Sequence, residues 1–349
     1  MPPMVLILMM LTIGLGTLIT VTSSHWLLAW MGLELNTLAI IPIMAHRHHP
    51  RAAEAATKYF LAQATAAAML LFSTIINAWM TGQWCIGQQM SALPHTMIIL
   101  ALALKIGLAP LHSWLPEVLQ GLDLSTGLLL STWQKLAPFS LLLQLQPQDH
   151  PLFLIIGLIS VLVGGWGGLN QIQLRKILAY SSITHMGWMI MVMQFSPPLA
   201  MLTLLTYIIM TTSAFLLFKL KKTYSINQLA SSWTMFPALT AMTPLVLLSL
   251  GGLPPLTGFM PKWLILQELT TQALTPLATL MAMSALFSLY FYLRLSYSMT
   301  LTMFPHNMLA AAPWRLNPPN NNSLITAYMT MTTALMLPMA PTTMTLLTY

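Results

Sequence analysis

Long apolar segments separated by short polar stretches run along the whole chain. Each segment has about 20 residues, which is the length that an α-helix needs to cross a bilayer. The predicted spans are 3–22, 25–45, 56–79, 95–116, 124–145, 151–171, 177–195, 198–218, 238–267, 275–294 and 323–346. The pattern therefore predicts an all-α, polytopic membrane protein of about eleven transmembrane helices. We expect the two longest connections, 219–237 and 295–322, to lie along the membrane surface.

The composition excludes several classes of soluble protein. Only 5% of the 349 residues are charged and 57% are hydrophobic, whereas a soluble domain has about 25% charged residues. No basic stripe with interleaved aromatic residues suggests nucleic-acid binding. The single cysteine, Cys85, leaves no internal disulfide and no self-contained iron–sulfur cluster, which needs about four thiolates. No glycine-rich dinucleotide motif follows a strand, so we expect this chain to bind no cofactor and no metal.

The basic residues in the loops or at the ends of the spans predict the orientation of the chain. If the loops alternate between the two sides of the membrane, all of them fall on the side of the N-terminus: Arg47, Arg51, Lys58, Arg175, Lys176, Lys219, Lys221, Lys222, Arg294 and Arg315. The positive-inside rule makes that side the cytoplasm or the mitochondrial matrix, with the C-terminus opposite. The first segment lacks a basic n-region and a clear cleavage site, so we expect a retained span.

Four charged residues remain within or beside the predicted spans, namely Glu34, Lys105, Lys135 and Lys262. Each would cost about 2.5–3.5 kcal/mol at mid-membrane, or roughly 10–14 kcal/mol together, if it faced lipid. They must therefore face the protein, form pairs or contact water. A Glu–Lys pair that only holds helices together is the simpler alternative. One glutamate cannot pair with three lysines, however, so the set favours an ion or proton pathway.

Lysine suits a proton relay because its ammonium group loses stability when it leaves water and can then give up its proton near neutral pH. A nearby carboxylate has the opposite effect. Movement of Glu34 relative to Lys105 would therefore switch whether Lys105 holds its proton.

Two similar motifs predict interrupted helices. "GLAPLHSWLP" at 107–116 and "GLPPLTGFMP" at 252–261 share the pattern G-L-x-P-L-x-x-aromatic-apolar-P. Proline breaks a helix, and unpaired backbone at membrane depth is tolerated only inside protein or beside a hydrated cavity. The residues expected to make the breaks are Gly107, Pro110, Pro116, Gly252, Pro254, Pro255 and Pro261.

The spacing of the two motifs also predicts the domain organisation. The copies lie in the fourth and ninth spans, five positions apart, so the interrupted helices cross the membrane in opposite directions, as in the inverted repeats of transporters. We expect one antiporter-like membrane domain over 1–349. It comprises five-helix repeats at 1–146 and 147–294, then a surface segment and last helix at 295–349.

Four motifs carry a resemblance to a known family: "ALALKIGLAPLHSWLPEV", "STWQKLAP", "LRKILAYSSITHMGW" and "GGLPPLTGFMPKW". They resemble motifs of the NADH–ubiquinone oxidoreductase chain 2 family, whose members are antiporter-like subunits of the membrane arm of respiratory complex I. The likeness covers essentially the whole chain. The chain has eleven predicted spans and 29 methionines, and in both respects it is similar to the animal mitochondrial form of the family. Members encoded by the organelle need no transit peptide. The resemblance implies a mitochondrial inner-membrane protein with its N-terminus in the matrix and its C-terminus in the intermembrane space.

The resemblance also implies a function. The chain would be a translocase subunit of H⁺-translocating NADH:ubiquinone reductase, with Glu34, Lys105, Lys135 and Lys262 joined by water into a relay. NADH, FMN, iron–sulfur clusters and ubiquinone would be handled by other subunits. Neighbouring antiporter-like and small membrane subunits and accessory subunits would be its partners, and cardiolipin is expected at the basic loops. A stand-alone cation/proton antiporter and a structural spacer remain the alternatives.

Several other polar residues have two readings. His112 in the first break and His185 in "SSITHMGW" could link the lysines, although a hydrogen-bonded packing histidine is the commoner role. The cluster His46, His48 and His49 has no nearby carboxylate or cysteine, so we expect a loop rather than a metal site. Three further residues could order water or form hydrogen bonds between helices, namely Tyr180, Ser181 and Ser182.

Overall fold

The computed structural model describes residues 2–46, 49–88, 90–145, 151–234, 237–301 and 323–348. Within these ranges the chain forms helices and two isolated backbone bridges, and no strand. It divides into two compact units, Met1–Ile156 and Gly157–Tyr349. The residues Arg47, His48 and Arg315 and most of the connection 295–322 lie outside the described residues.

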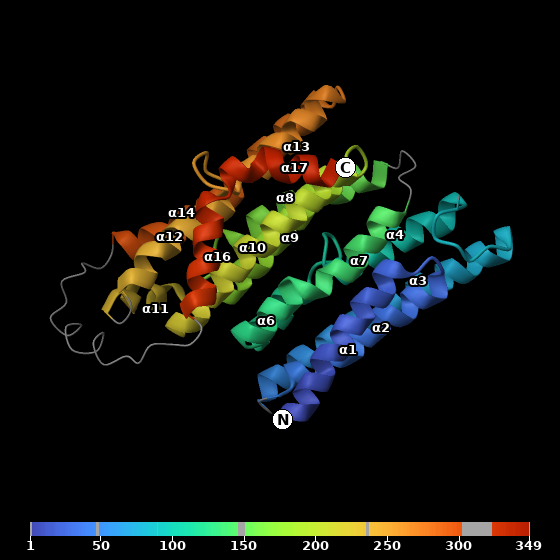
Figure 1. Cartoon of the computed structure of the whole chain (residues 1–349), viewed down its shortest axis with the longest axis horizontal. Coiled ribbons are helices and arrows are strands. Elements are labelled where there is room, and N and C mark those ends of the chain that lie inside the picture. The colour runs from blue at the N-terminus through green and yellow to red at the C-terminus, as the bar shows by residue number, and fades with distance from the viewer. Residues whose placement is uncertain are drawn as a thin grey trace. The chain divides into compact units, whose positions relative to one another are not determined.

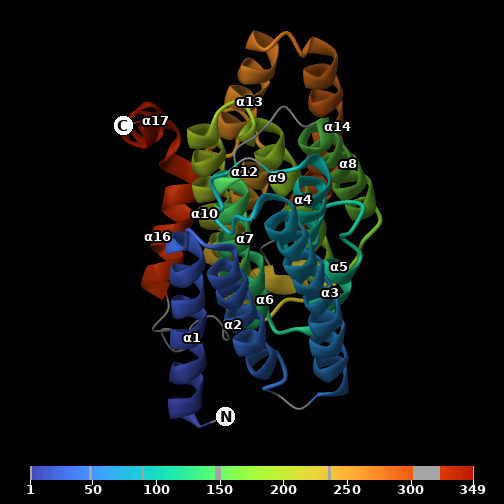
Figure 2. The ribbon, with the colours of Figure 1, turned by 90° about the vertical axis from the view of Figure 1, so that its right-hand side faces the viewer.

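The first unit begins with three long apolar helices that run side by side (Figures 1 and 2). They are α1 (Pro3–Thr22), α2 (Trp26–Met44) and α3 (Pro50–Thr81). Four shorter helices follow, namely α4 (Ala92–Ile106), α5 (Trp114–Gly121), α6 (Leu124–Ser131) and α7 (Trp133–Gln144). The Trp30 indole on α2 donates to the Ala67 carbonyl on α3 at 3.1 Å.

Glycines allow α1 and α2 to pack closely. A Cβ atom at Gly16 would lie 2.9 Å from the Gly32 carbonyl and would overlap the Asn36 carboxamide. Small residues at such crossings are typical of membrane helices, whose association depends on close packing rather than on the hydrophobic effect.

Helix α8 (Pro151–Gly168) begins within the first unit and lies mostly in the second unit, which also contains the remaining helices. These are α9 (Leu174–Met193), α10 (Pro197–Lys221), α11 (Ile226–Ser231), η1 (Ser232–Thr234), α12 (Pro237–Gly251), α13 (Phe259–Thr271), α14 (Thr275–Thr300), α16 (Ser323–Leu335), η3 (Leu337–Met339) and α17 (Ala340–Thr348). Almost every residue of α9 is buried. Because protein rather than lipid surrounds α9, it can carry polar residues such as Ser181, Thr184 and His185 in its middle.

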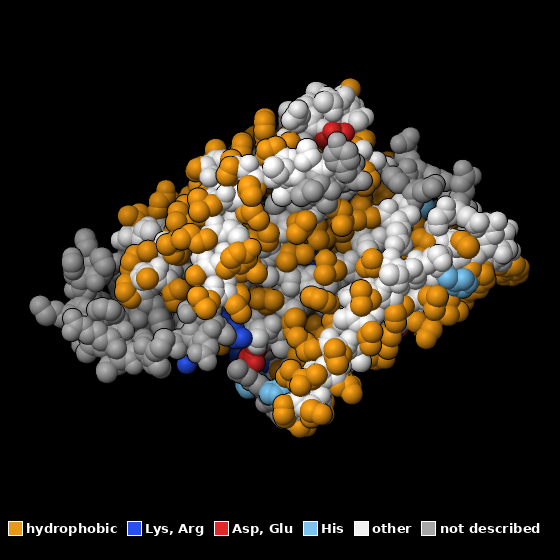
Figure 3. Space-filling view, in the orientation of Figure 1, with side chains coloured by type: hydrophobic (Ala, Val, Ile, Leu, Met, Phe, Trp, Pro, Cys, Tyr) orange, Lys and Arg blue, Asp and Glu red, His pale blue; other side chains and the backbone are white. Residues whose placement is uncertain are grey.

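Each of the eleven predicted spans coincides with one helix or with two consecutive helices, so the all-α membrane fold is confirmed. In the part of the chain that the structure describes, six single helices are long and apolar enough to cross a membrane, namely α1, α2, α3, α8, α10 and α14. The pair α16 and α17 is bent by 67° and is long and apolar enough when taken together. The spans 95–116, 124–145 and 238–267 correspond to the pairs α4–α5, α6–α7 and α12–α13. Hydrophobic side chains spread over much of the visible surface, as expected for a protein in contact with lipid (Figure 3).

The two predicted discontinuities are confirmed, and both are built in the same way. Helix α4 ends at Ile106 and α12 ends at Gly251, and each is followed by a glycine in the left-handed region, Gly107 with φ 85° and Gly252 with φ 82°. Glycine is the residue that ends helices in this conformation without a steric penalty. The chain becomes helical again at Trp114 and Phe259.

The prolines of the two motifs fall in different places. Pro110 lies in the first interruption, and Pro254 and Pro255 lie in the second. Pro116 and Pro261, by contrast, lie in the first turns of α5 and α13. A proline is tolerated there because its missing N–H would have no helical partner. The irregular segments are therefore 107–113 and 252–258, shorter than the motifs that predict them.

Candidate functional site

The end of α4 is held by side chains from neighbouring helices. The Trp114 indole on α5 donates to the Leu104 carbonyl at 3.0 Å, and the Gln63 amide on α3 donates to the Lys105 carbonyl at 3.3 Å. The Gly107 and Leu108 amides both donate to the Ala103 carbonyl at 2.9 Å. These bonds satisfy carbonyl groups that a helix end leaves without partners, and they fix the backbone of Lys105 at the break.

A second irregular helix positions Lys135. Helices α6 and α7 are separated at Thr132, and Lys135 lies in the first turn of α7. Pro138 follows within α7 and has no N–H to offer the Gln134 carbonyl. Helix α7 packs against α4, and the side chains of Lys105 and Lys135 are both buried, with 6% and 4% of their surface exposed.

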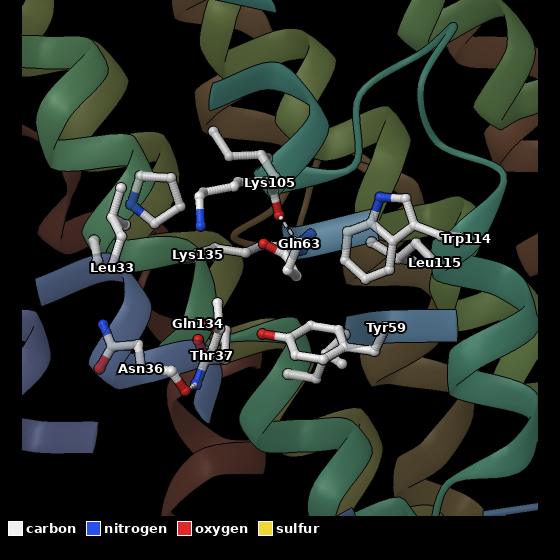
Figure 4. Close-up of a pocket in the computed structure, with 14 residues that line it drawn as sticks. Leu33, Asn36, Thr37, Tyr59, Gln63, Lys105, Trp114, Leu115, Gln134 and Lys135 are labelled. Carbon is white, nitrogen blue, oxygen red and sulfur yellow. Dashed lines mark hydrogen bonds between the residues drawn. The ribbon is translucent and has the colours of Figure 1, made fainter. Parts of the chain in front are cut away.

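Lys105 and Lys135 line the same cavity in the first unit (Figure 4). The volume open to the centres of water molecules is about 20 Å³, which exceeds the roughly 10–15 Å³ that one water needs. Side chains of α2 to α7 form the wall, and the polar ones besides the lysines are Asn36, Thr37, Tyr59, Gln63 and Gln134. The cavity is therefore large and polar enough to hold water.

Glu34 on α2 is linked to this cavity through its neighbour Thr37. It is half-buried and does not form part of the wall, but the Thr37 hydroxyl, which does, donates to the Glu34 carboxylate at 2.7 Å. The Lys105 Nζ atom is buried and has no hydrogen-bond partner among the described residues. Glu34 and Lys105 thus form no direct ion pair in the part of the chain that the structure describes.

His112 lies in the interruption between α4 and α5 but is not part of the cavity wall. Its half-buried side chain interacts with the backbone of Pro110. Its backbone carbonyl accepts from the Leu115 amide at 3.1 Å. The position of His112 fits a residue that holds the bend, and its role in proton transfer stays a prediction.

In the second unit, Lys262 caps the end of the interrupted helix. Its Nζ atom donates to the Gly251 carbonyl, the last residue of α12, at 2.8 Å. A cation at this position is favourable because the carbonyl groups at a helix C-terminus carry partial negative charge. Arg294 likewise places its cation at the C-terminus of α8, where it donates to the Leu169 carbonyl at 2.7 Å.

The other polar residues singled out from the sequence lie on or near α9. The His185 ring lies 5.6 Å from the Tyr207 ring on α10. The hydroxyls of Ser181 and Ser182 donate to carbonyls of their own helix at 2.8 and 2.7 Å, and Tyr180 lies against Gly167 of α8. In the first unit, His49 accepts from the Arg51 amide and caps α3. No group of three or more potential metal ligands is found among the described residues.

Lys221 is buried, whereas the sequence predicts a basic residue exposed at the membrane surface. It is the last residue of α10, and only 6% of its surface is exposed. Its Nζ atom donates to the Thr243 hydroxyl on α12 at 3.0 Å, and that hydroxyl donates to the Thr240 carbonyl at 2.9 Å. Its place in the run "KLKK" hides this burial, because the other lysines of the run make the whole segment look solvated.

The sequence did not single out the uncharged polar residues of the cavity. Asn36, Gln63 and Gln134 are amides on helices α2, α3 and α7. Their position could have been predicted, because amide side chains within a membrane span generally face protein or water. Tyr59 and Trp114, which pack edge to face at 5.8 Å, carried no comparable signal.

Gly252→Ala is expected to destabilise the second break. An alanine would have to adopt a left-handed conformation, which costs about 1–2 kcal/mol, and its Cβ would lie 3.0 Å from the Lys262 Cδ atom. The temperature at which the assembled protein loses its structure should fall. Gly14→Ala is the matched control, because that glycine lies within α1 with no atom near a Cβ. Equal melting temperatures for the two variants would contradict the expected strain.

Comparison with known proteins places the chain in a family. Residues 23–288 match the family model for the transmembrane part of NADH:quinone oxidoreductase and Mrp antiporters. Residues 289–344 match the model for the C-terminus of NADH dehydrogenase subunit 2.

Similar proteins cover the whole length of the chain. NADH-ubiquinone oxidoreductase chain 2 of Tetraodon nigroviridis is 69% identical over 332 residues, which is 95% of each chain. That of Salmo salar is 62% identical over 352 residues and covers 100% of both. Among solved structures, a chain of respiratory complex I from Thermus thermophilus is 28% identical with a TM-score of 0.80, covering 96% of this chain and 79% of that one. A chain of an archaeal membrane-bound sulfane sulfur reductase shares the fold, with a TM-score of 0.85 at 15% identity over 97% of this chain and 74% of its own. The chain therefore belongs to the NADH–ubiquinone oxidoreductase chain 2 family.

Proposed function

We propose that this chain is a core membrane-arm subunit of proton-pumping NADH:ubiquinone oxidoreductase and that its first unit transfers protons through the cavity between Lys105 and Lys135. The observation that carries the proposal is that two buried lysines, from two irregular helices, line one water-sized polar cavity. Whole-length similarity to chain 2 relatives supports the assignment to complex I.

The residues of the cavity have distinct roles in this proposal. Lys105 holds and releases a proton at Nζ, and water in the cavity passes the proton between Lys105 and Lys135. The negative charge of Glu34 favours the protonated form of Lys105. A conformational change that separates Glu34 from Lys105 would then release the proton. Among the described residues Lys105 Nζ has no hydrogen-bond partner that would oppose this release.

The two alternatives fit less well. A structural spacer would be expected to pair its buried charges, because an unpaired buried charge is costly, whereas the Lys105 Nζ atom has no hydrogen-bond partner among the described residues. A stand-alone antiporter would not account for identity of 58–69% to complex I chains over nearly the whole length.

In the second unit we propose that Lys262 continues the relay. Its contact with the Gly251 carbonyl would hold the ammonium at the end of α12 until the break changes shape. His112 and His185 are the remaining candidates for proton transfer, one beside the first break and one within α9. The repeats 1–146 and 147–294 would supply one such pathway each, with 295–349 as the additional segment.

The proposal extends to the parent complex. We expect translocase activity in this chain and no redox centre, with NADH, FMN, iron–sulfur clusters and ubiquinone bound by other subunits, since one cysteine cannot hold a cluster. Its partners would be neighbouring antiporter-like, small membrane and accessory subunits. The basic loops would face the matrix with the N-terminus and contact cardiolipin, and the C-terminus would face the intermembrane space.

Glu34→Gln tests the electrostatic part of the proposal. Glutamine keeps the shape and can still accept from Thr37, but it removes the charge that acts on Lys105. We expect NADH oxidation coupled to ubiquinone reduction by the assembled complex to fall about tenfold, which corresponds to about 1.4 kcal/mol of barrier. NADH oxidation by a water-soluble electron acceptor should be unchanged, because it does not need proton transfer in the membrane arm.

Glu54→Gln is the control for this change. Glu54 lies at the start of α3, is exposed, and pairs with Lys58 at 2.8 Å, an interaction of small energetic weight. Coupled turnover should be nearly unaffected. If both glutamine variants behave alike, the charge of Glu34 has no special role.

A further inference from the structure

Asn36 has a buried polar side chain with no hydrogen-bond partner in the part of the protein that the structure describes. It lies on α2, only 2% of its surface is exposed, and its side chain lines the cavity that Lys105 and Lys135 share (Figure 4). Neither Oδ1 nor Nδ2 has a hydrogen-bond partner among the described residues. Buried amide groups in folded proteins nearly always have a partner, which is protein or ordered water.

The surroundings hold the carboxamide in place. Gly16 on α1 has no Cβ and therefore leaves room for the Asn36 Oδ1 atom, which a Cβ would overlap. On the other side, the Gln134 amide of α7 donates to the Asn36 backbone carbonyl at 3.4 Å. Asn36 is thus held between α1 and α7 at the wall of the cavity.

We infer that the Asn36 carboxamide binds a water molecule in this cavity and positions it for the Lys105 ammonium group. The inference rests on the proposed function, because it assigns a positioning residue to the proposed proton pathway. Lys105 Nζ is likewise buried without a partner among the described protein atoms. Water in the cavity would give both groups a partner, and a polar cavity of this size can hold a water molecule.

An amide is suited to this position because it both donates and accepts. When Lys105 is protonated, Nζ donates to the water and the water donates to Asn36 Oδ1. When Lys105 is neutral, Nζ can accept from the water and Asn36 Nδ2 can donate to it. The same water therefore stays bound in both states of the lysine, so that the pathway remains connected.

The test compares variants of the complete complex. Asn36→Leu removes both polar atoms from the cavity wall and is expected to lower coupled ubiquinone reduction at least fivefold with normal assembly. Asn77→Leu is the matched control, since Asn77 on α3 is 3% exposed, has an unpartnered Oδ1 and does not line the cavity. Asn36→Ser keeps a hydroxyl and leaves room for another water, so it should restore at least half of the activity.

The outcomes separate this inference from the proposed function. Loss of activity in Asn36→Leu and recovery in Asn36→Ser support the role of Asn36, because a purely structural residue would not be rescued by a smaller side chain. If Lys105→Met abolishes coupled turnover but Asn36→Leu does not, the inference is wrong and the proposed function stands. If neither change has an effect, the proposed function fails as well.

A structural measurement decides the case in which Asn36→Leu does not assemble. A high-resolution map of the unaltered complex should show water within hydrogen-bonding distance of the Asn36 carboxamide. A carboxamide that contacts only protein atoms of this or a neighbouring subunit in every state would overturn the inference.

Discussion

Lys105→Met is expected to reduce coupled ubiquinone reduction by at least tenfold while the complex still assembles. Methionine fills a similar volume without a charge, so the cavity keeps its shape but loses the group that holds the proton. A charged side chain at the centre of a membrane helix costs about 2.5–3.5 kcal/mol, and a barrier raised by that amount corresponds to a rate lower by roughly 70- to 370-fold. We expect a loss of only tenfold or more because other slow steps in the catalytic cycle can limit the turnover of the unaltered complex.

Lys58→Met is the control for the loss of a lysine. Lys58 is exposed and forms ion pairs with Glu54 at 2.8 Å and Glu117 at 2.7 Å, and exposed pairs contribute about 0.2–1 kcal/mol. Its replacement should alter stability slightly and leave coupled turnover close to normal. Equal activity of the Lys105 and Lys58 variants would show that burial in the cavity gives Lys105 no special function.

Ala137→Leu is expected to have a similarly large effect by a different route. Ala137 is on α7, is 1% exposed and lines the cavity, so a larger side chain would occupy the space that we assign to water. All four charged residues of the proposed relay would remain. We expect at least a tenfold loss of coupled turnover, together with a stability cost of about 1–3 kcal/mol for overpacking.

Ala66→Leu separates the two consequences of the larger side chain. Ala66 is fully buried on α3 but does not line the cavity, so its replacement overpacks the first unit without displacing water. The assembled Ala66 variant should keep its coupled turnover. If the Ala137 variant turns over normally at comparable assembly, then water in this cavity is not needed.

Much of the fold follows from the sequence because a bilayer restricts the choices. Backbone groups in lipid must be paired within the chain, so an apolar segment of about 20 residues predicts a helix. The glycine and proline pattern also predicts where α4 and α12 end, because Gly107 and Gly252 adopt a conformation that other residues avoid. The exact position at which each helix resumes depends on local packing, and Pro116 and Pro261 proved compatible with a helix start.

The candidate site could be predicted only in part. Burial of Lys105 and Lys135 follows from the cost of placing charge in lipid, and the structure brings both to one cavity. The sequence does not reveal that Gln63 caps the Lys105 carbonyl or that Asn36 lines the same cavity. Those contacts join side chains on different helices, and an amide in an apolar helix gives no indication of which helix it faces. The burial of Lys221 against Thr243 was hidden for another reason, because the neighbouring lysines make its segment look solvated.

The central claim is that protons pass through the cavity of the first unit. The most direct test is to count the protons that are translocated into sealed vesicles for each NADH oxidised. The measurement compares the unaltered complex with the Lys105→Met complex at equal rates of NADH oxidation, set by limiting the NADH supply of the faster one. Our account predicts a lower ratio for Lys105→Met, because its residual turnover proceeds without the protons that this cavity carries. An equal ratio would contradict the account, because protons would then cross the membrane without Lys105.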